Sequence, residues 1–308
     1  MAKSFGRKRG RVLSRLAVAA IAAALVGTSA GAAVADNPVP RSAKSALPDT
    51  GAGIAADAAA ESADAPVNAL YGVDKNGDFW GYAPNGTGAF DAREELGFGF
   101  NYVKHAVQVD HNADGSSDGT WEINTDGGFD YYPWGEEAVS AGTGWNIYNK
   151  IVSPGNLAST VADDLLARDT AGVLWLYQGN GNGTVKSRVR VGSGWNAYTQ
   201  IAGQGDLSGD GRADIVARDT AGALYLYKGT GSATAPFGAR IKVGASGWNT
   251  YNTLVSVGDI DLDGMTDLIA RDTAGALWLY KGTGSATAPY KARVKIGASG
   301  WNIYRLLL

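Results

Sequence analysis

Three short segments of the sequence carry oxygen-bearing side chains at the same spacing, which suits the binding of a hard cation. Residues 110–118, 206–214 and 259–267 each follow the pattern Asp-x-(Asp, Asn or Ser)-x-Asp-Gly-x-x-Asp. Ligands at alternate positions let a tight loop wrap one calcium ion, and the seventh residue can add its backbone carbonyl. We therefore predict about three structural Ca2+ ions. The predicted ligand positions are Asp110, Asn112, Asp114, Ser116 and Asp118; Asp206, Ser208, Asp210, Arg212 and Asp214; and Asp259, Asp261, Asp263, Met265 and Asp267.

These loops differ from the calcium loop of an EF-hand. An EF-hand has a glutamate at the twelfth position and flanking helices, whereas Trp121, Ala217 and Ala270 stand there and an aspartate at the ninth position replaces it. We expect a strand–loop–strand site. The alternative is that the loops are solvated Asp-Gly turns, which are common. A fourth copy, residues 156–164, has Val161 in place of the turn glycine and is predicted to bind no metal.

A second repeated pattern, Gly-Trp-Asn-x-Tyr, places an aromatic ring beside an amide. This combination suits a pyranose, because the sugar C–H groups stack on the ring while the hydroxyls need donors and acceptors. The alternative is that each tryptophan fills the space between packed sheets. The candidate ligand-binding residues are Trp145, Asn146, Tyr148, Trp195, Asn196, Tyr198, Trp248, Asn249, Tyr251, Trp301, Asn302 and Tyr304.

Further aromatic and basic residues accompany this pattern in the repeats. Arg188, Arg240 and Arg293 precede the tryptophans, and we expect them to pair with aspartates across strands or to contact acidic groups of a ligand. A second aromatic set consists of Trp80, Trp175, Tyr225 and Trp278, with Asp130 at the corresponding position of one copy.

The same inventory of residues argues against an enzyme. The chain has no cysteine and two histidines, His105 and His111, neither of which accompanies a nucleophile motif. A glycosidase needs two carboxylates across a cleft, but the metal loops account for most aspartates and the last glutamate is Glu137. A hydrolase is therefore the least favoured function.

The elements that position these residues repeat along the chain. The tryptophan marker recurs at Trp145, Trp195, Trp248 and Trp301, with gaps of 50, 53 and 53 residues, and Phe100 marks a degenerate earlier copy. Each copy contains short alternating runs, such as Leu-Trp-Leu-Tyr at 277–280, separated by glycine-rich turns. Four strands in a unit of roughly 40–50 residues indicate a propeller blade. Five copies predict an all-β, five-bladed β-propeller.

The two ends of the repeat region predict how the ring closes. The first copy begins at Ala69–Val73, without the acidic loop that precedes this strand elsewhere, and residues 304–308 form the strand that elsewhere runs into that loop. The break between the termini therefore falls inside one blade, so we expect N- and C-terminal strands to share a sheet. A closed ring leaves only short, protected strand edges.

The N-terminal part has a different character from the repeats. Residues 1–35 carry six basic residues and no acid, followed by a short apolar run and Ala33-Val34-Ala35, which together predict a secretory signal peptide. Residues 36–66 contain no aromatic residue, and we expect a disordered linker before a propeller at 67–308. Beyond residue 35 the chain has 21 basic and 30 acidic residues, which argues against nucleic-acid binding. No later segment is long and apolar enough to suggest a membrane span.

The acidic loop, followed by Asp-Leu-Ile-Ala and Leu-Trp-Leu-Tyr-Lys-Gly-Thr-Gly, resembles FG-GAP/VCBS-type repeats of integrin-α-like propellers. The segment 291–308 and the run Leu70-Tyr71-Gly72-Val73 resemble the repeats of tachylectin-like five-bladed lectins. The second resemblance implies binding of N-acetylated sugars between blades. The calcium loops are absent from that family, and Thr287–Tyr290 differs from its Asp-Asn-Trp motif, so its sugar contacts do not carry over residue by residue.

These patterns together predict a secreted, non-catalytic, calcium-stabilised, multivalent binding protein, with carbohydrate on a cell surface as the favoured ligand. The alternative is a protein-interaction propeller, such as a subunit of a larger secreted, toxin-type particle. The divergent copy at 110–155, with Asp130, Trp134, Glu136 and Glu137, fits a surface for such a protein partner.

Overall fold

The computed structural model describes residues 65–308. The predicted signal peptide at 1–35 and the predicted linker at 36–66, apart from Ala65 and Pro66, lie outside the described residues. Within the described part of the chain, no helix has the length and apolar character needed to cross a membrane.

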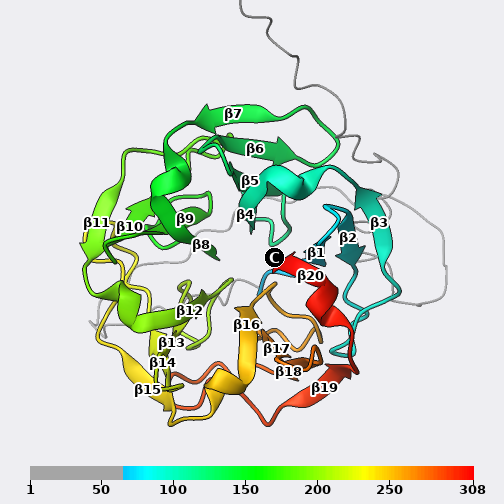
Figure 1. Ribbon diagram of the computed structural model, residues 1–308. Coiled ribbons are helices and arrows are strands. Elements are labelled where there is room, and N and C mark those ends of the chain that lie inside the picture. The colour runs from blue at the N-terminus through cyan, green and yellow to red at the C-terminus, as the bar shows by residue number, and fades with distance from the viewer. Residues whose placement is uncertain (1–64) are drawn as a thin grey trace, which may run out of the picture.

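The described residues form twenty strands in five antiparallel sheets of four, arranged as blades of a ring (Figure 1). Blade 1 contains β20 (Tyr304–Leu307), β1 (Leu70–Asp74), β2 (Phe79–Tyr82) and β3 (Glu94–Gly97). Blade 2 contains β4 (Val103–Val109), β5 (Gly119–Asn124), β6 (Phe129–Pro133) and β7 (Val139–Gly142). Blade 3 contains β8 (Tyr148–Gly155), β9 (Asp164–Asp169), β10 (Leu174–Tyr177) and β11 (Val189–Gly192). Blade 4 contains β12 (Tyr198–Ala202), β13 (Ile215–Asp219), β14 (Leu224–Tyr227) and β15 (Ile241–Gly244). Blade 5 contains β16 (Tyr251–Val255), β17 (Leu268–Asp272), β18 (Leu277–Tyr280) and β19 (Val294–Gly297). The prediction of a five-bladed β-propeller is confirmed.

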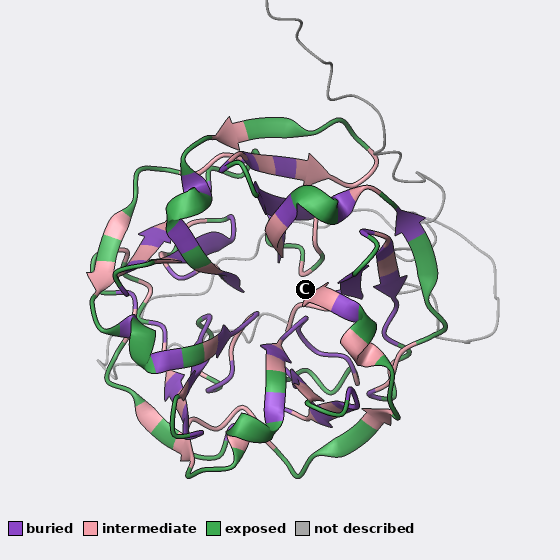
Figure 2. Cartoon of the chain, viewed as in Figure 1, coloured by how far each residue is buried: buried purple, intermediate pink, exposed green. Residues whose placement is uncertain are grey.

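Alternation along each strand gives every blade two packing faces. In β10, Leu174 and Leu176 are buried against Ile215 of blade 4. The residues between and after them, Trp175 and Tyr177, pack on the core shared with blade 2. Five such cores, one in each gap between blades, replace a single central core, and Figure 2 shows the buried residues lying within and between the blades.

The ring closes inside blade 1, as the sequence predicts. Strand β20 pairs with β1 in antiparallel register, with Gly72 opposite Leu307 and Val73 opposite Leu306. The Tyr71 amide donates to the Leu308 carbonyl at 2.7 Å, and the Leu308 amide donates back at 3.0 Å. Gly72 lies under the ring of Tyr304, where a Cβ would come within 2.6 Å of that ring, so this position needs a residue without a side chain.

The ring has two different faces. A short 3-10 helix precedes each inner strand; these helices are η1 (Phe100–Tyr102), η2 (Trp145–Ile147), η3 (Trp195–Ala197), η4 (Trp248–Thr250) and η5 (Trp301–Ile303). The acidic loops follow the inner strands at their other ends. We call these the η face, which is nearest the viewer in Figure 1, and the loop face.

Cationic side chains join each blade to the next near the η face. Arg168 of β9 donates through Nη1 to the Trp195 and Tyr198 carbonyls of blade 4, at 2.9 and 2.6 Å. Arg218 and Arg271 make the same pair of bonds to the blades that follow them. These bonds satisfy carbonyl groups at the start of the next inner strand, where the ladder has not begun.

Blades 1 and 2 make this connection from a different strand. The position of Arg168 is taken there by Val73 and Ile123. Arg305 of β20 instead donates to the Val103 and Phe100 carbonyls at 2.7 and 2.5 Å, and Lys104 of β4 donates to the Tyr148 carbonyl at 2.8 Å. Each blade therefore supplies one cation to its neighbour, from the first or the second strand.

The segment before β1 is bound on the axis of the loop face. The Val67 amide donates to the Gly115 carbonyl at 2.9 Å, and the Asp259 amide donates to the Pro66 carbonyl at 2.7 Å. The Ser117 amide donates to Asn68 Oδ1 at 2.7 Å. Residues 66–68 thus connect the acidic loops of blades 2 and 5.

Candidate calcium loops and inter-blade pockets

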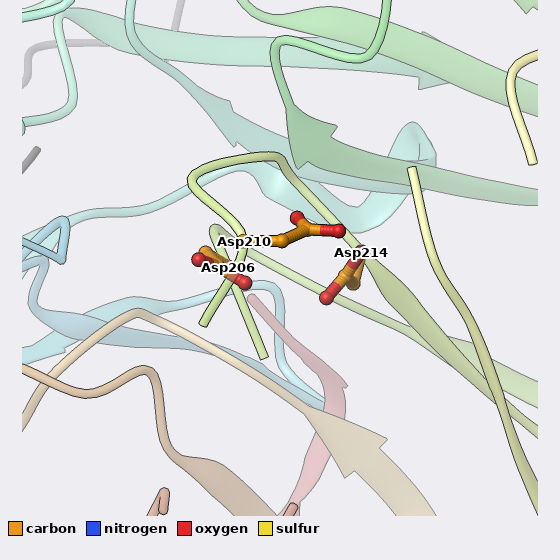
Figure 3. A group of neighbouring side chains, drawn as sticks. All are labelled: Asp206, Asp210 and Asp214. Carbon is orange, nitrogen blue, oxygen red and sulfur yellow. The ribbon is translucent and has the colours of Figure 1, made fainter. Parts of the chain in front are cut away.

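The loop at 206–214 brings three carboxylates together. Asp206, Asp210 and Asp214 each offer an oxygen, and these oxygens lie within 4.8 Å of one another (Figure 3). Backbone amides hold the outer two in place: Asp206 accepts from Ser208 and Gly211 at 2.8 and 2.6 Å, and Asp214 accepts from Gly229 at 2.7 Å. The arrangement is that of a turn wrapped around its own first carboxylate, with the next acids directed to the same point.

The loop at 259–267 repeats this geometry with a different middle ligand. Oxygens of Asp259, Asp261 and Asp267 lie within 4.8 Å of one another. Asp263 instead pairs with Lys291 at 2.9 Å. Asp261 has a side chain only 6 % exposed, and one of its oxygens pairs with Lys281 Nζ at 2.5 Å. Its other oxygen, Oδ1, is buried without a hydrogen-bond partner, as expected of an atom directed at a cation site.

Burial makes these acids costly to ionise without a counter-charge. It raises the pKa of Asp214 to about 6 and that of Asp267 to about 7, with neighbouring aspartates adding to both shifts. The pKa of Asp259 is raised for the same reason. A bound divalent cation would favour the ionised forms.

The loop at 110–118 has the same turn but a looser cluster. Asp110 accepts from the Ala113 and Gly115 amides at 2.7 and 2.9 Å, and Asp118 accepts from the His111 amide at 2.7 Å. Among the residues that the structure describes, the acids that meet within 4.8 Å belong to the other two loops. Asn112 also donates to Asp118 at 3.4 Å, so one predicted ligand is turned inward as a donor.

The loop at 156–164 keeps the turn without the acids. Asn156 stands in the first position, and its Oδ1 accepts from the Ala158 and Thr160 amides at 3.1 and 3.0 Å. Asp164 is fully buried and accepts from the Leu157 and Gly179 amides at 3.0 and 3.1 Å. Asp214 and Asp267 accept the same two bonds, so this loop differs from the two acidic loops in its first and middle positions, where Asn156 and Thr160 replace aspartates.

On the η side, four blades carry the same set of side chains around a pair of tyrosine hydroxyls. In blade 1 the Tyr82 and Tyr304 hydroxyls lie 2.5 Å apart, and Arg93 Nη1 donates to Tyr304 at 3.0 Å. Burial, followed by the hydrogen bond between the two hydroxyls, raises the pKa of Tyr82, which keeps it neutral. The corresponding groups in blades 3, 4 and 5 are Tyr148, Tyr177 and Arg188; Tyr198, Tyr227 and Arg240; and Tyr251, Tyr280 and Arg293.

Each of these arginines also covers an aromatic ring. The guanidinium carbon of Arg188 lies 4.1 Å from the centroid of Trp175, and those of Arg93, Arg240 and Arg293 lie 4.0 to 4.4 Å from Trp80, Tyr225 and Trp278. The indole N–H of Trp175 donates to Asp169 at 2.9 Å. The expected pairing of the arginines with aspartates is therefore replaced by contacts with a tyrosine hydroxyl and an aromatic face.

In blade 1 these groups surround an open pocket. It has a volume of about 310 Å3 and is lined by Tyr82, Arg93, Ser299, Gly300, Trp301, Ile303 and Tyr304. The pocket lies between blades 5 and 1, with Trp301 packed on Tyr82 at a centroid distance of 4.5 Å. Trp301 thus both fills the gap between the blades and forms a wall of the pocket.

The predicted aromatic and amide residues have different surroundings. Trp145 and Trp195 are 7 % exposed and lie between blades, and the tyrosines of the marker hold the arginines. The amides of Asn196, Asn249 and Asn302 donate to carbonyls of a neighbouring turn, at 3.3, 3.1 and 3.0 Å. Asn146 packs against Gly127 in the same way. The asparagines support the turns from which the second strands leave.

Blade 2 lacks this set of side chains. Val103 and Phe100 replace the tyrosine and tryptophan of the marker, and Ala138 stands where the other blades have arginine. Asp130, in the place of Trp175, accepts from Asn124 at 2.7 Å. The set is therefore present in four blades of the described ring.

Comparisons with solved structures find proteins that are similar to this chain at low sequence identity. The BP39L lectin from Burkholderia pseudomallei is 13 % identical, with a TM-score of 0.47, over 78 % of this chain and 71 % of that one. A mutant of the Aleuria aurantia lectin in complex with Fucα1-6GlcNAc is 14 % identical, with a TM-score of 0.42, over 76 % and 77 %. Prp20p from Saccharomyces cerevisiae is 10 % identical, with a TM-score of 0.37, over 75 % and 61 %.

At the level of sequence, the similarity is confined to part of the ring. No curated protein matches the chain. A family match covers a segment that starts at Asp206, the first acid of the blade 4 loop, and ends at Ala270, three residues after the blade 5 loop. Residues 206–270 are similar to the FG-GAP-like repeat.

Proposed function

We propose that this chain is a secreted, non-catalytic binding protein that holds carbohydrate in four inter-blade pockets and is stabilised by calcium on its loop face. The observation that carries the proposal is the fourfold recurrence, on one side of the ring, of an arginine stacked on an aromatic ring beside two tyrosine hydroxyls. Inter-blade packing alone does not require an exposed arginine at each of these positions.

The chemistry of the pocket suits a sugar. Its aromatic walls offer faces for C–H groups, while the arginine and the hydroxyls offer donors in fixed positions. A volume of about 310 Å3 is at the lower end of the range for small-molecule sites, roughly 300–1,000 Å3, and is sufficient for a monosaccharide. Four weak sites on one side of a rigid ring would bind a polyvalent surface with a gain in avidity of about 10²–10⁴.

Calcium is proposed for the two loops in which the acids converge. Asp206, Asp210 and Asp214 would hold one ion and Asp259, Asp261 and Asp267 another, with the buried, unpartnered oxygen of Asp261 supporting the second. The loop at 110–118 is proposed as a third, weaker site. Secretion is proposed from the pattern of residues 1–35.

The proposal of a non-catalytic role is supported by the surroundings of the two histidines. His111 packs edge-on against Trp121 and Tyr131, and His105 lies in an inner strand. A protein partner remains the alternative ligand, favoured by blade 2, where the pocket is replaced by acidic residues such as Glu136 and Glu137.

A glycan array tests the proposal directly. The full chain should bind a set of related glycans, and binding should fall when EDTA removes calcium. The variant R93A/R188A/R240A/R293A should lose this binding, whereas Lys75→Ala, which removes an exposed cation in the turn between β1 and β2, should keep it. If no glycan on the array is bound and one protein co-purifies with the chain, the carbohydrate proposal is refuted in favour of a protein partner.

A further inference from the structure

The inner strands enclose a small cavity on the axis of the ring. Its volume is about 80 Å3, too small for a drug-sized ligand, for which roughly 300 Å3 is typical. Its middle is apolar, formed by Ala106, Ala202 and Leu254. Lys150 lines it toward the η face, because this residue lies near the start of its strand.

Lys150 carries a positive charge in this cavity without an acidic partner. Its Nζ lies 3.4 Å from Gln200 Oε1, a neutral acceptor. Lys150 is half-buried, and burial, followed by the like charges of Arg168 and Arg218, lowers its pKa to about 8. A buried ammonium normally has a counter-charge or a full set of acceptors.

The neighbouring cations are held in place and cannot turn away. Arg168 and Arg218 are fixed by the carbonyls of the next blades, and Lys104 by the Tyr148 carbonyl. His105, beside Lys104, has its Nε2 atom buried without a hydrogen-bond partner. In the part of the chain that the structure describes, no ion pair with a carboxylate is formed by Lys104, Lys150, Arg168 or Arg218.

Two carboxylates that lie beside these cations on the strands, Asp169 next to Arg168 and Glu122 opposite Ala106, interact with other groups. Asp169 accepts from Trp175, and Glu122 acts on Arg305 rather than on Lys150. The excess of positive charge at the mouth of the cavity therefore contrasts with the acidic composition of the propeller as a whole.

We propose that the η-side mouth of the axial cavity binds an oxyanion, with the Lys150 ammonium as its main contact and Lys104, Arg168 and Arg218 providing the surrounding positive potential. The bound group is a phosphate or a carboxylate, either free in solution or at the end of an acidic glycan. This site is separate from the inter-blade pockets and is present once in the ring.

The sequence itself offers a variant that should fold. Lys150 lies opposite Arg168, and Gln200 lies opposite Arg218 at the same register in blade 4. Lys150→Gln therefore installs a residue that the next blade already accommodates. Lys75→Met is the matched control, since Lys75 is exposed in the turn between β1 and β2.

The experiment measures melting temperature and binding heat for the full chain, without added calcium, in a Tris chloride buffer at constant ionic strength. Inorganic phosphate is the probe for a free anion, and methyl glucuronide is the probe for the end of an acidic glycan. The original chain and K75M should be stabilised by at least one of the two, whereas K150Q should bind that anion at least about tenfold more weakly.

The comparison between the two probes assigns the source, because the more tightly bound one identifies a free anion or a glycan end group. Without any anion, K150Q should melt at a higher temperature than the original chain, since it removes a poorly solvated charge. Equal stabilisation of K150Q and the original chain, or no response to either probe, would overturn the proposal. Binding to the neutral glycans of the array does not enter this test, so the two proposals can fail independently.

Discussion

Lys281 is the residue that most directly opposes calcium in the acidic loops. Its Nζ lies 2.5 Å from Asp261, so an ion that takes this oxygen must displace the ammonium group or share the oxygen with it. The lysine and the ion are therefore alternative partners for the same acid. Sequence spacing predicts the acids but not this competitor, because the lysine directly follows β18 and reaches the loop only through the fold.

Replacing Lys281 with methionine should increase the difference in stability between the calcium-free and the calcium-bound chain. Without calcium, the buried Asp261 loses its partner, and unfolding should need about 1–3 kcal/mol less free energy. With calcium, the affinity should rise several-fold because the competitor is gone. Calorimetry in EDTA and in calcium measures both effects. Lys291→Met, which releases the more exposed Asp263, is the control, and equal effects of the two variants would contradict the role given to Lys281.

His105 gives a prediction about pH. Burial, followed by the charges of Lys104 and Lys150, lowers its pKa to about 4, against about 6.5 in the unfolded chain. Between these values the unfolded chain binds more protons than the fold, so stability falls as the pH is lowered through this range. The loss from this group has an upper limit of about 3 kcal/mol.

His105→Gln should therefore flatten the pH dependence of stability between about pH 6.5 and 4. Glutamine already occupies the corresponding position in blade 4, as Gln200. Urea unfolding at several pH values measures the effect, and His111 contributes equally to both proteins. Parallel curves for the two proteins would show that His105 is readily protonated in the fold.

At the scale of the element, a cationic side chain joins each blade to the next. It lies on the second strand in blades 3, 4 and 5 and on the first strand in blades 1 and 2. Where the second strand has Arg168, Arg218 or Arg271, the first strand has an asparagine or threonine that accepts from the guanidinium, such as Thr199 Oγ1 at 2.9 Å from Arg218 Nε. Where the second strand has Val73 or Ile123, the first strand supplies the cation.

Because the cation can lie on either strand, removing it from the second strand should lower stability, and supplying one from the first strand should restore part of that stability. Arg218→Met should lower the free energy of unfolding by about 2–3 kcal/mol, because two carbonyls of blade 5 lose a charged donor. Adding Thr199→Lys and using isoleucine at 218 reproduces the arrangement of Lys104 and Ile123, and should restore part of that loss. Chemical unfolding measures both, with Arg240→Met as the exposed control in the same blade. A double variant no more stable than R218M would refute the equivalence of the two arrangements.

The acidic loops also act at this scale, and they should differ in affinity. The loops at 206–214 and 259–267 have converging carboxylates, whereas the loop at 110–118 uses Asn112 as a donor toward Asp118. Calorimetric titration of the chelator-treated chain should therefore find two tighter calcium sites and at most one weaker site. Asp267→Asn should remove one of the tight sites, while Asp91→Asn, at an exposed position outside the acidic loops, should leave the count unchanged. Three sites of equal affinity would contradict this order.

The elements were largely predictable from the sequence, and their connections were not. Period-2 alternation gives strands such as β10 and β18, and the recurrence of the tryptophan marker gives the number of blades. The pairing of Arg188 with Tyr148 joins residues 40 positions apart, from the outer and inner strands of a blade, and no local pattern encodes it. The prediction that aspartates would be the partners failed because stacking on Trp175 directs the guanidinium toward the tyrosine.

At the scale of the whole molecule, closure inside blade 1 ties the stability of the ring to one strand pair. Strand β20 contributes Tyr304 and Leu307 to the core between blades 5 and 1, and Leu308 to the core between blades 1 and 2. This arrangement was predictable, since the first repeat starts at Ala69–Val73, which corresponds to the second strand of the other repeats. The presence of the arginine and the paired tyrosines in four blades rather than five was not, because Phe100 and Val103 resemble a degenerate copy of the same marker.

Deleting residues 304–308 should therefore destabilise every blade rather than blade 1 alone. We expect loss of a cooperative thermal transition and binding of a hydrophobic dye, because two cores lose buried side chains at once. Differential scanning calorimetry of this variant beside Leu308→Ala, a milder change in the same strand pair, measures the effect. A deletion variant that still melts in one sharp transition would show that the ring does not depend on this closure.

The path of residues 66–68 bears on how the molecule carries mechanical load. The chain reaches the ring on the axis of the loop face, bonded to blades 2 and 5, while the pocket beside η5 opens on the other side. If the pockets hold a surface, as proposed, tension between that surface and residue 65 would cross the ring from one face to the other. The hydrogen bonds of residues 66–68 to blades 2 and 5 would share this load before it reached β1.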